Sequence, residues 1–174
     1  DLVRSYGGQL WLDPGEPDAQ EYSLRVFADV IRRYDIDGIH IDDYFYPYRA
    51  QDKDKKTIPF PDQAPYERYQ KAGGRLERND WRRDNINRFV ANMYGIAKRT
   101  RPTVQVGISP FGIWRPGNPP QIRGFDAYAQ LYADARKWMI NGWADYFAPQ
   151  LYWSIGQREQ SFPVLLNWWD AQNP

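Results

Sequence analysis

Two adjacent carboxylates stand in the middle of "DGIHIDDYFYPY", residues 37–48, where Asp42 and Asp43 follow an alternating apolar stretch and precede a run of aromatic residues. In a site of low dielectric, neighbouring carboxyl groups disfavour each other's ionisation, so one stays protonated while the other stays ionised. Cleavage of a glycosidic bond uses such an acid together with an ionised partner. The sequence therefore predicts that Asp42 and Asp43 are catalytic carboxylates. An acidic turn or a helix N-cap is the structural alternative.

The alternation within this strand predicts which side chains share a face with the acids. Ile39 and Ile41 are expected to face the covering helices, which places His40 and Asp42 on the other side. Asp42 would then point into a cleft at the carboxyl end of the strand, with Asp43 on the rim. His40 is expected to orient the substrate or the acids, and an interior histidine with satisfied hydrogen bonds is the alternative.

The ends of the other predicted strands supply further candidates for substrate binding. The same alternation gives Trp11 and Asp13 in "GQLWLD" (8–13), Ser109 in "VQVGIS" (104–109), and Gln150 and Tyr152 in "DYFAPQLYW" (145–153).

Aromatic residues that follow strand ends inside polar loops are expected to stack on sugar rings. They are Tyr44, Tyr46, Trp114, Tyr152 and Trp153. Arg82 and Asn85 lie on the buried side of the first turn of a helix that starts near Asp80. They could hold a substrate hydroxyl or carboxylate, cap the helix, or pair with a neighbouring acid.

The predicted elements alternate between strands and helices. Helical periodicity covers 19–34, 81–99 and 125–141, between strands at 8–13, 37–42, 104–109 and 145–153. This order favours βαβ units around a parallel sheet. Long Gly/Pro-rich loops follow the strands, as functional loops do in α/β folds, and residues 43–80 are too many for a simple connection.

We therefore expect a single α/β domain over 1–174 of about four βα units, roughly half of a (β/α)₈ TIM barrel of ~250 residues. A complete doubly wound domain is the alternative.

Composition narrows the possible partners. Aromatic residues make up 17% of the chain, including 8 Trp and 13 Tyr, which suits stacking on sugars or nucleobases. The formal net charge of +1 disfavours nucleic acid, because phosphate binding usually requires a basic excess. With no Cys and one His, the sequence predicts no disulfide, no zinc site and no cofactor. It also contains no apolar run long enough to span a membrane.

The stretches "LDPGEP", "YDIDGIHIDDYFYPY", "DWRRDNINRFV" and "VGISPFGIWRP" occur in this order across nearly the whole chain. Together they resemble the glycosyl hydrolase-like 10 family of bacterial (β/α)₈-barrel proteins. The resemblance implies that the chain covers roughly the third to the sixth βα units, with the first and last units absent. It also implies hydrolysis of cell-envelope glycan strands, peptidoglycan in particular, in the periplasm or outside the cell, with any targeting signal outside this fragment.

A more distant resemblance leaves the second carboxylate open. "DGIHID" is similar to the fourth-strand pattern of α-amylase-type barrels, which implies a nucleophile role for Asp42. His40 replaces the usual Arg, however, and "GISPFG" lacks the usual Glu. The second acid could be Asp43, Asp13 or a residue outside this chain. Alternatively, the substrate's own acetamido group could attack, as in hexosaminidase-type barrels, with Gln150 and Tyr152 holding that group.

Two other functions compete with the polysaccharide hydrolase. A non-catalytic carbohydrate-binding barrel would keep the aromatic residues and need no acid pair. A metal-dependent hydrolase would use Asp13, His40, Asp42 and Asp43 as ligands.

Overall fold

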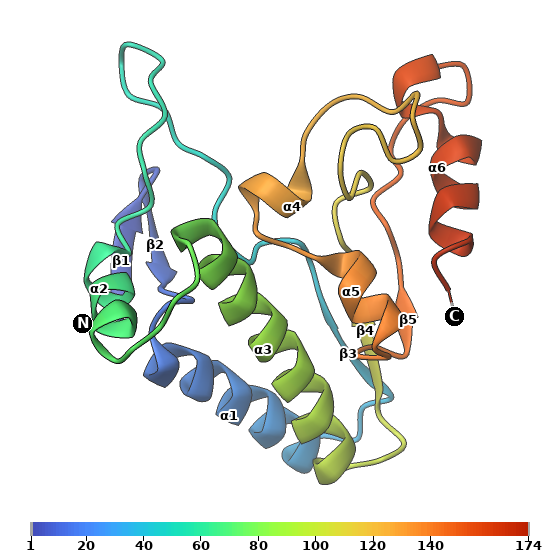
Figure 1. The fold of residues 1–174 in the computed structure, drawn as a ribbon. Coiled ribbons are helices and arrows are strands. Elements are labelled where there is room, and N and C mark those ends of the chain that lie inside the picture. Colours follow the sequence, from blue (N-terminus) through green and yellow to red (C-terminus); the bar gives the residue numbers. More distant parts are fainter. Residues whose placement is uncertain (1, 174) are drawn as a thin grey trace.

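The computed structural model describes residues 2–173, which begin with a β-hairpin rather than a βα unit (Figure 1). Strands β1 (Val3–Tyr6) and β2 (Gln9–Leu12) pair antiparallel, with Val3 opposite Leu12. Gly7 and Gly8 form the turn with φ of 58° and 78°, the backbone sign that tight hairpin turns require. The strand predicted at 8–13 is thus present, but its assignment to the parallel sheet is wrong because its partner is β1.

A parallel sheet in the order β3-β4-β5 forms the centre of the fold. Its strands are β3 (Gly38–Ile41), β4 (Gln105–Ile108) and β5 (Tyr146–Phe147). His40 lies opposite Gly107, and Gly107 lies opposite Tyr146. The predicted βαβ arrangement is confirmed for these three strands. Closure into a (β/α)₈ barrel stays a prediction, because the described strands form an open sheet.

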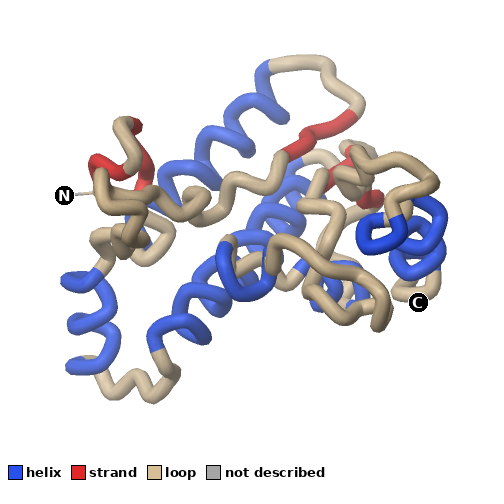
Figure 2. Tube along the Cα trace, turned by 90° about the horizontal axis from the view of Figure 1, so that it is seen from above, coloured by secondary structure: helices blue, strands red, loops and turns tan. Residues whose placement is uncertain are grey.

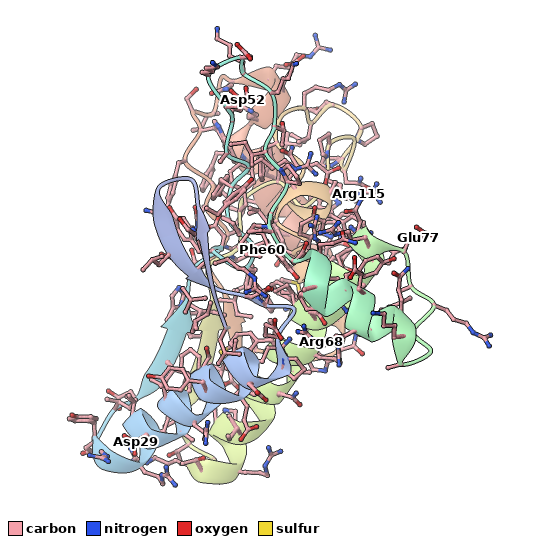
Figure 3. All side chains as sticks on the ribbon, turned by 90° about the vertical axis from the view of Figure 1, so that its left-hand side faces the viewer. Asp29, Asp52, Phe60, Arg68, Glu77 and Arg115 are labelled. Atoms are coloured by element: carbon pink, nitrogen blue, oxygen red, sulfur yellow. The ribbon has the colours of Figure 1, made fainter. Side chains whose placement is uncertain are left out.

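Two long helices lie side by side and pack against one face of the sheet (Figures 1, 2 and 3). Helix α1 (Pro17–Arg33) begins with Pro17, whose fixed φ suits the first helical turn. Helix α3 (Arg78–Thr100) follows the short helix α2 (Gln63–Lys71). Ile39 is buried against these helices as the alternation predicted, whereas His40 and Asp42 are exposed.

The helix predicted over 125–141 is divided in two. Helices α4 (Ala127–Gln130) and α5 (Ala135–Ile140) are separated by Tyr132, which has a φ of 58°. Asp126 and Asp134 each accept a hydrogen bond from a backbone amide at the start of a helix, so each begins a new one. The remaining helices are η1 (Arg158–Gln160) and α6 (Phe162–Asp170). No helix within residues 2–173 has the length and apolar character of a membrane span.

Candidate functional site

The two adjacent aspartates point into different environments. Asp42 follows β3 directly and its side chain is exposed, whereas Asp43 is only 2% exposed. The Tyr48 hydroxyl donates a short hydrogen bond to Asp43 Oδ2. The expected place of Asp43 on the rim is therefore wrong: the strand ends at Ile41, and the turn that follows directs Asp43 into the interior. Asp42 remains as the carboxylate at the open end of the strand.

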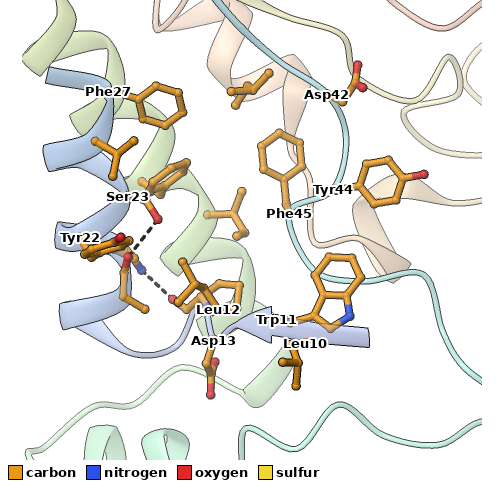
Figure 4. Close-up of a pocket in the computed structure, with 17 residues that line it drawn as sticks. Leu10, Trp11, Leu12, Asp13, Tyr22, Ser23, Phe27, Asp42, Tyr44 and Phe45 are labelled. Carbon is orange, nitrogen blue, oxygen red and sulfur yellow. Dashed lines mark hydrogen bonds between the residues drawn. The ribbon is translucent and has the colours of Figure 1, made fainter. Parts of the chain in front are cut away.

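An apolar groove of about 520 Å³ extends from the hairpin past α1 to Asp42 (Figure 4). Trp11 and Tyr44 form one part of its wall, with ring centroids 6.3 Å apart and an interplanar angle of 27°. Tyr44 is 62% exposed, so its ring is available to a ligand. The groove thus brings two near-parallel aromatic rings and an exposed carboxylate together. We call these two residues the Trp11–Tyr44 wall.

Tyr48 joins Asp43 to this wall. Its ring meets Tyr44 edge-on at 5.8 Å, and its hydroxyl donates to Asp43. Burial, together with the hydrogen bond to the Asp43 carboxylate, raises the pKa of Tyr48 well above its usual value. Tyr48 therefore remains a neutral hydrogen-bond donor throughout the physiological pH range.

Ser109 and Gln150 lie near the ends of β4 and β5, as predicted, but both make contacts within the sheet. The Ser109 hydroxyl donates to the Ala148 carbonyl at 2.8 Å, and Gln150 Nε2 donates to the Ser109 carbonyl at 3.0 Å. Ser109 is buried and Gln150 is half-buried. In this structure these groups join the segments after β4 and β5 to each other.

The predicted sugar-stacking aromatics divide into exposed and packed residues. Tyr152 is 84% exposed. Tyr46 is 1% exposed, and its ring packs edge-on against Phe60 and Tyr132, so its prediction as part of a sugar-facing wall is wrong. The reason is that residues after a strand no longer alternate between two faces. The run "YFYPY" therefore sends Tyr44 outward and Tyr46 inward.

Trp114 and Trp153 are half-buried within aromatic packing. Trp114 stacks on Trp168 at 5.7 Å and 17°, and its Nε1 donates to Asp134 at 3.0 Å. Trp153 meets Phe111 edge-on at 5.7 Å. Neither ring lines the groove beside Asp42.

Arg82 and Asn85 lie on the buried side of α3, as predicted, and Arg82 pairs with an acid. Arg82 Nε and Nη2 donate to both carboxylate oxygens of Asp62 at 2.7 and 2.6 Å, and Nη1 donates to the Tyr132 hydroxyl at 2.6 Å. Although burial opposes its charge, these hydrogen bonds and the attraction of Asp62 raise the pKa of Arg82. Asn85 is 2% exposed and accepts from Arg88 at 2.7 Å. The structure thus supports pairing with an acid for Arg82, and it brings neither side chain to Asp42.

Asp13 is fully buried in a second ion-pair cluster. It accepts from Arg4 Nε at 2.9 Å and from the Gly15 amide at 2.8 Å, and Arg4 also pairs with Glu16. Burial is the main cause that raises the pKa of Asp13. As Figure 4 shows, its carboxylate does not lie beside Asp42.

The four ligands suggested for a metal site are therefore not gathered. Among residues 2–173 no group of three or more His, Cys, Asp or Glu side chains could hold a metal ion together.

Sequence reasoning missed three polar residues that bind side chains predicted for the site. Tyr48 binds Asp43, Asp62 neutralises Arg82, and Tyr146 binds His40 with its hydroxyl 3.0 Å from Nδ1. Only Tyr146 could have been found from strand register, because His40 pairs with Gly107 and Gly107 pairs with Tyr146, which puts the two side chains in the same row of the sheet.

A family model for "Glycosyl hydrolase-like 10" matches residues 1–173. The chain belongs to the glycosyl hydrolase-like 10 family. The glycosyl hydrolase YngK of Bacillus subtilis strain 168 is 43% identical over 178 residues, which cover 99% of this chain and 34% of that protein. The glycosyl hydrolase DigH of Escherichia coli strain K12 is 35% identical over 173 residues, or 97% of this chain and 38% of that protein. The chain thus spans about a third of the length of these relatives.

Membership confirms the family suggested by the sequence motifs.

Proposed function

We propose that this chain contributes catalytic residues to a glycoside hydrolase that cleaves a bacterial cell-envelope polysaccharide, with peptidoglycan glycan strands as the substrate. The observation that carries the proposal is the exposed Asp42 carboxylate at the carboxyl end of β3, in a groove whose wall includes Trp11 and Tyr44. Such an enzyme would act in the periplasm or outside the cell, where its substrate lies.

Asp42 is the carboxylate that we expect to contact the substrate. Its place on the strand leaves it accessible, and no other described side chain forms a hydrogen bond or ion pair with it. A sugar ring stacked on the Trp11–Tyr44 wall would lie next to this group. Asp42 could therefore act as a nucleophile, as an acid, or as the group that orients an acetamido oxygen.

Asp43 has a different relation to the substrate. Because it is buried and accepts from Tyr48, it can influence a bound sugar through Tyr48, whose ring lies edge-on against Tyr44. Asp42 and Asp43 could then act as an orienting pair in a substrate-assisted reaction. In a conventional mechanism the second carboxylate would come from another part of the longer protein. The separation of its carboxyl group from Asp42 would be near ~5 Å for retention and ~6.5–9.5 Å for inversion.

The test is hydrolysis of purified glycan strands by the full-length protein carrying Asp42→Asn, Asp43→Asn or Asp37→Asn. Asp37 is an exposed aspartate just before β3, at the opposite end from Asp42, and serves as the matched control. We expect Asp42→Asn to reduce the rate by about 10²- to 10⁴-fold, the range found for positioned acid and base groups. Asp37→Asn should leave the rate unchanged. Full activity in Asp42→Asn would refute the assignment.

A non-catalytic carbohydrate-binding barrel is the second candidate. It is favoured by one observation: of the two adjacent aspartates only Asp42 lines the groove, because Asp43 is buried. Asp13, the other acid that lines the groove, is fully buried and paired with Arg4. Binding of glycan strands by the full-length protein, without release of any fragments, would support this candidate over the hydrolase.

A further inference from the structure

A polar contact crosses the exposed face of the sheet beside Asp42. His40, Gly107 and Tyr146 occupy one row across β3, β4 and β5. His40 Nδ1 and the Tyr146 hydroxyl lie 3.0 Å apart, and the two rings are nearly parallel at 24° with centroids 5.6 Å apart. The outer strands therefore contact each other directly above the middle strand.

Gly107 provides the space for this contact. A Cβ atom at this position would lie 2.1 Å from Tyr146 Cζ and 2.4 Å from the Tyr146 hydroxyl. These atoms belong to a ring that covers the strand, so any side chain at Gly107 would displace the tyrosine. The glycine is thus required by the Tyr146 ring lying over it.

The direction of the hydrogen bond determines which nitrogen of His40 carries the proton. A phenol is a stronger acid than a neutral imidazole N–H, so we expect the Tyr146 hydroxyl to donate and Nδ1 to accept. The neutral ring then carries its proton on Nε2. No other described residue hydrogen-bonds this ring. His40 and Asp42 are two residues apart on the same side of the chain, which places them about 6.6 Å apart along a strand.

We propose that Tyr146 is a positioning residue that holds His40 with Nε2–H directed to donate to a sugar oxygen next to Asp42. His40 is then the group that contacts the substrate, and Tyr146 acts through it. This inference rests on the proposed function and deepens it, because it assigns to the sheet face beside Asp42, next to the groove, a neutral hydrogen-bond donor suited to a hydroxyl or acetamido oxygen.

The test compares Tyr146→Phe with Tyr34→Phe in the full-length protein. Tyr34 is a 60%-exposed tyrosine at the end of α1, away from the sheet, and is the matched control. Tyr146→Phe should lower kcat/KM on glycan strands about three- to tenfold, the value of one lost neutral hydrogen bond. Tyr34→Phe should have no effect. An unchanged kcat/KM in Tyr146→Phe would overturn the proposal.

A spectroscopic readout separates positioning from simple packing. Imidazole ¹⁵N shifts are recorded on histidine-labelled full-length protein at a pH that keeps the ring neutral, and His40 is identified as the signal missing in His40→Asn. We expect a single Nε2–H tautomer in the wild type and a mixture of tautomers in both Tyr146→Phe and Gly107→Ala. A proton on Nδ1 in the wild type, or unchanged shifts in Tyr146→Phe, would overturn the proposal.

This measurement needs no substrate. If the wild-type protein proved inactive on glycan strands, the proposed function would be wrong, but the ¹⁵N shifts would still show which nitrogen of His40 carries the proton.

Discussion

Replacement of Arg82 by Met separates a structural role from the substrate-binding role predicted from sequence. Arg82 is 7% exposed and Asp62 is fully buried, and they share two hydrogen bonds of 2.7 and 2.6 Å. Removing the guanidinium leaves Asp62 with Arg78 as its ion-pair partner. Breaking a buried ion pair on one side costs about 3–5 kcal/mol. Because Arg78 remains, we expect Arg82→Met to lower the free energy of unfolding by about 3 kcal/mol.

The assay is urea unfolding of the full-length protein, with Arg33→Met as the control. Arg33 forms an exposed i,i+4 pair with Asp29 at 2.9 Å, so its loss should cost no more than about 0.5 kcal/mol. The double variant Arg82→Met/Asp62→Asn should lose less free energy of unfolding than the two single variants added together, because neither member of the pair is then left as a buried charge without the other.

Loss of glycan binding by Arg82→Met with stability within 1 kcal/mol of wild type would refute the structural assignment. It would restore Arg82 as a substrate ligand.

Three other predictions concern the site and the hairpin. Tyr48→Phe leaves the buried Asp43 carboxylate without its donor, and should lower the free energy of unfolding in urea by about 1–3 kcal/mol; an unchanged midpoint would contradict the contact. Trp11→Ala should weaken glycan binding, measured by calorimetry, about tenfold, as truncation of an aromatic anchor does. If the variant bound glycan as tightly as the wild type, the Trp11–Tyr44 wall would not be part of the binding site. Asp13 has a raised pKa in the folded state, so its protonation favours folding as pH falls from 7 towards 4. The stability advantage of wild type over Asp13→Asn in urea should therefore be larger at pH 4 than at pH 7, and a larger advantage at pH 7 would contradict this.

The regular strands and helices were predictable because burying one face of an element makes apolar residues recur at a fixed spacing in the sequence. Ile39 and Val106 alternate with exposed or small residues, and the long helix α3 carries a periodic apolar face. The short segments were not predictable in this way. The hairpin strand β2 alternates like a sheet strand, and only its Gly7-Gly8 turn identifies the antiparallel partner. The break between α4 and α5 lies at Tyr132, which has a φ of 58° and whose hydroxyl accepts a hydrogen bond from Arg82, 50 residues away in the sequence.

The candidate site was predictable as far as the strand alternation extends. Asp42 and His40 lie on one exposed face because they are two residues apart within or next to β3. After the strand the period is lost, so sequence could not show that Asp43 and Tyr46 turn inward while Tyr44 turns outward. Polar residues such as Asp13 were also overinterpreted, because a buried ion pair and a ligand-binding acid have the same residue types.

The most direct test of the account is a crystal structure of the full-length Asp42→Asn variant with a bound glycan oligosaccharide. We predict a sugar ring against the Trp11–Tyr44 wall, with the side chain of residue 42 within about 2.6–3.2 Å of the glycosidic oxygen or of the reacting acetamido group. Asp43 should still accept from Tyr48 in that complex. An oligosaccharide bound elsewhere, with a different carboxylate nearest to its glycosidic bond, would contradict the central claim that Asp42 faces the substrate.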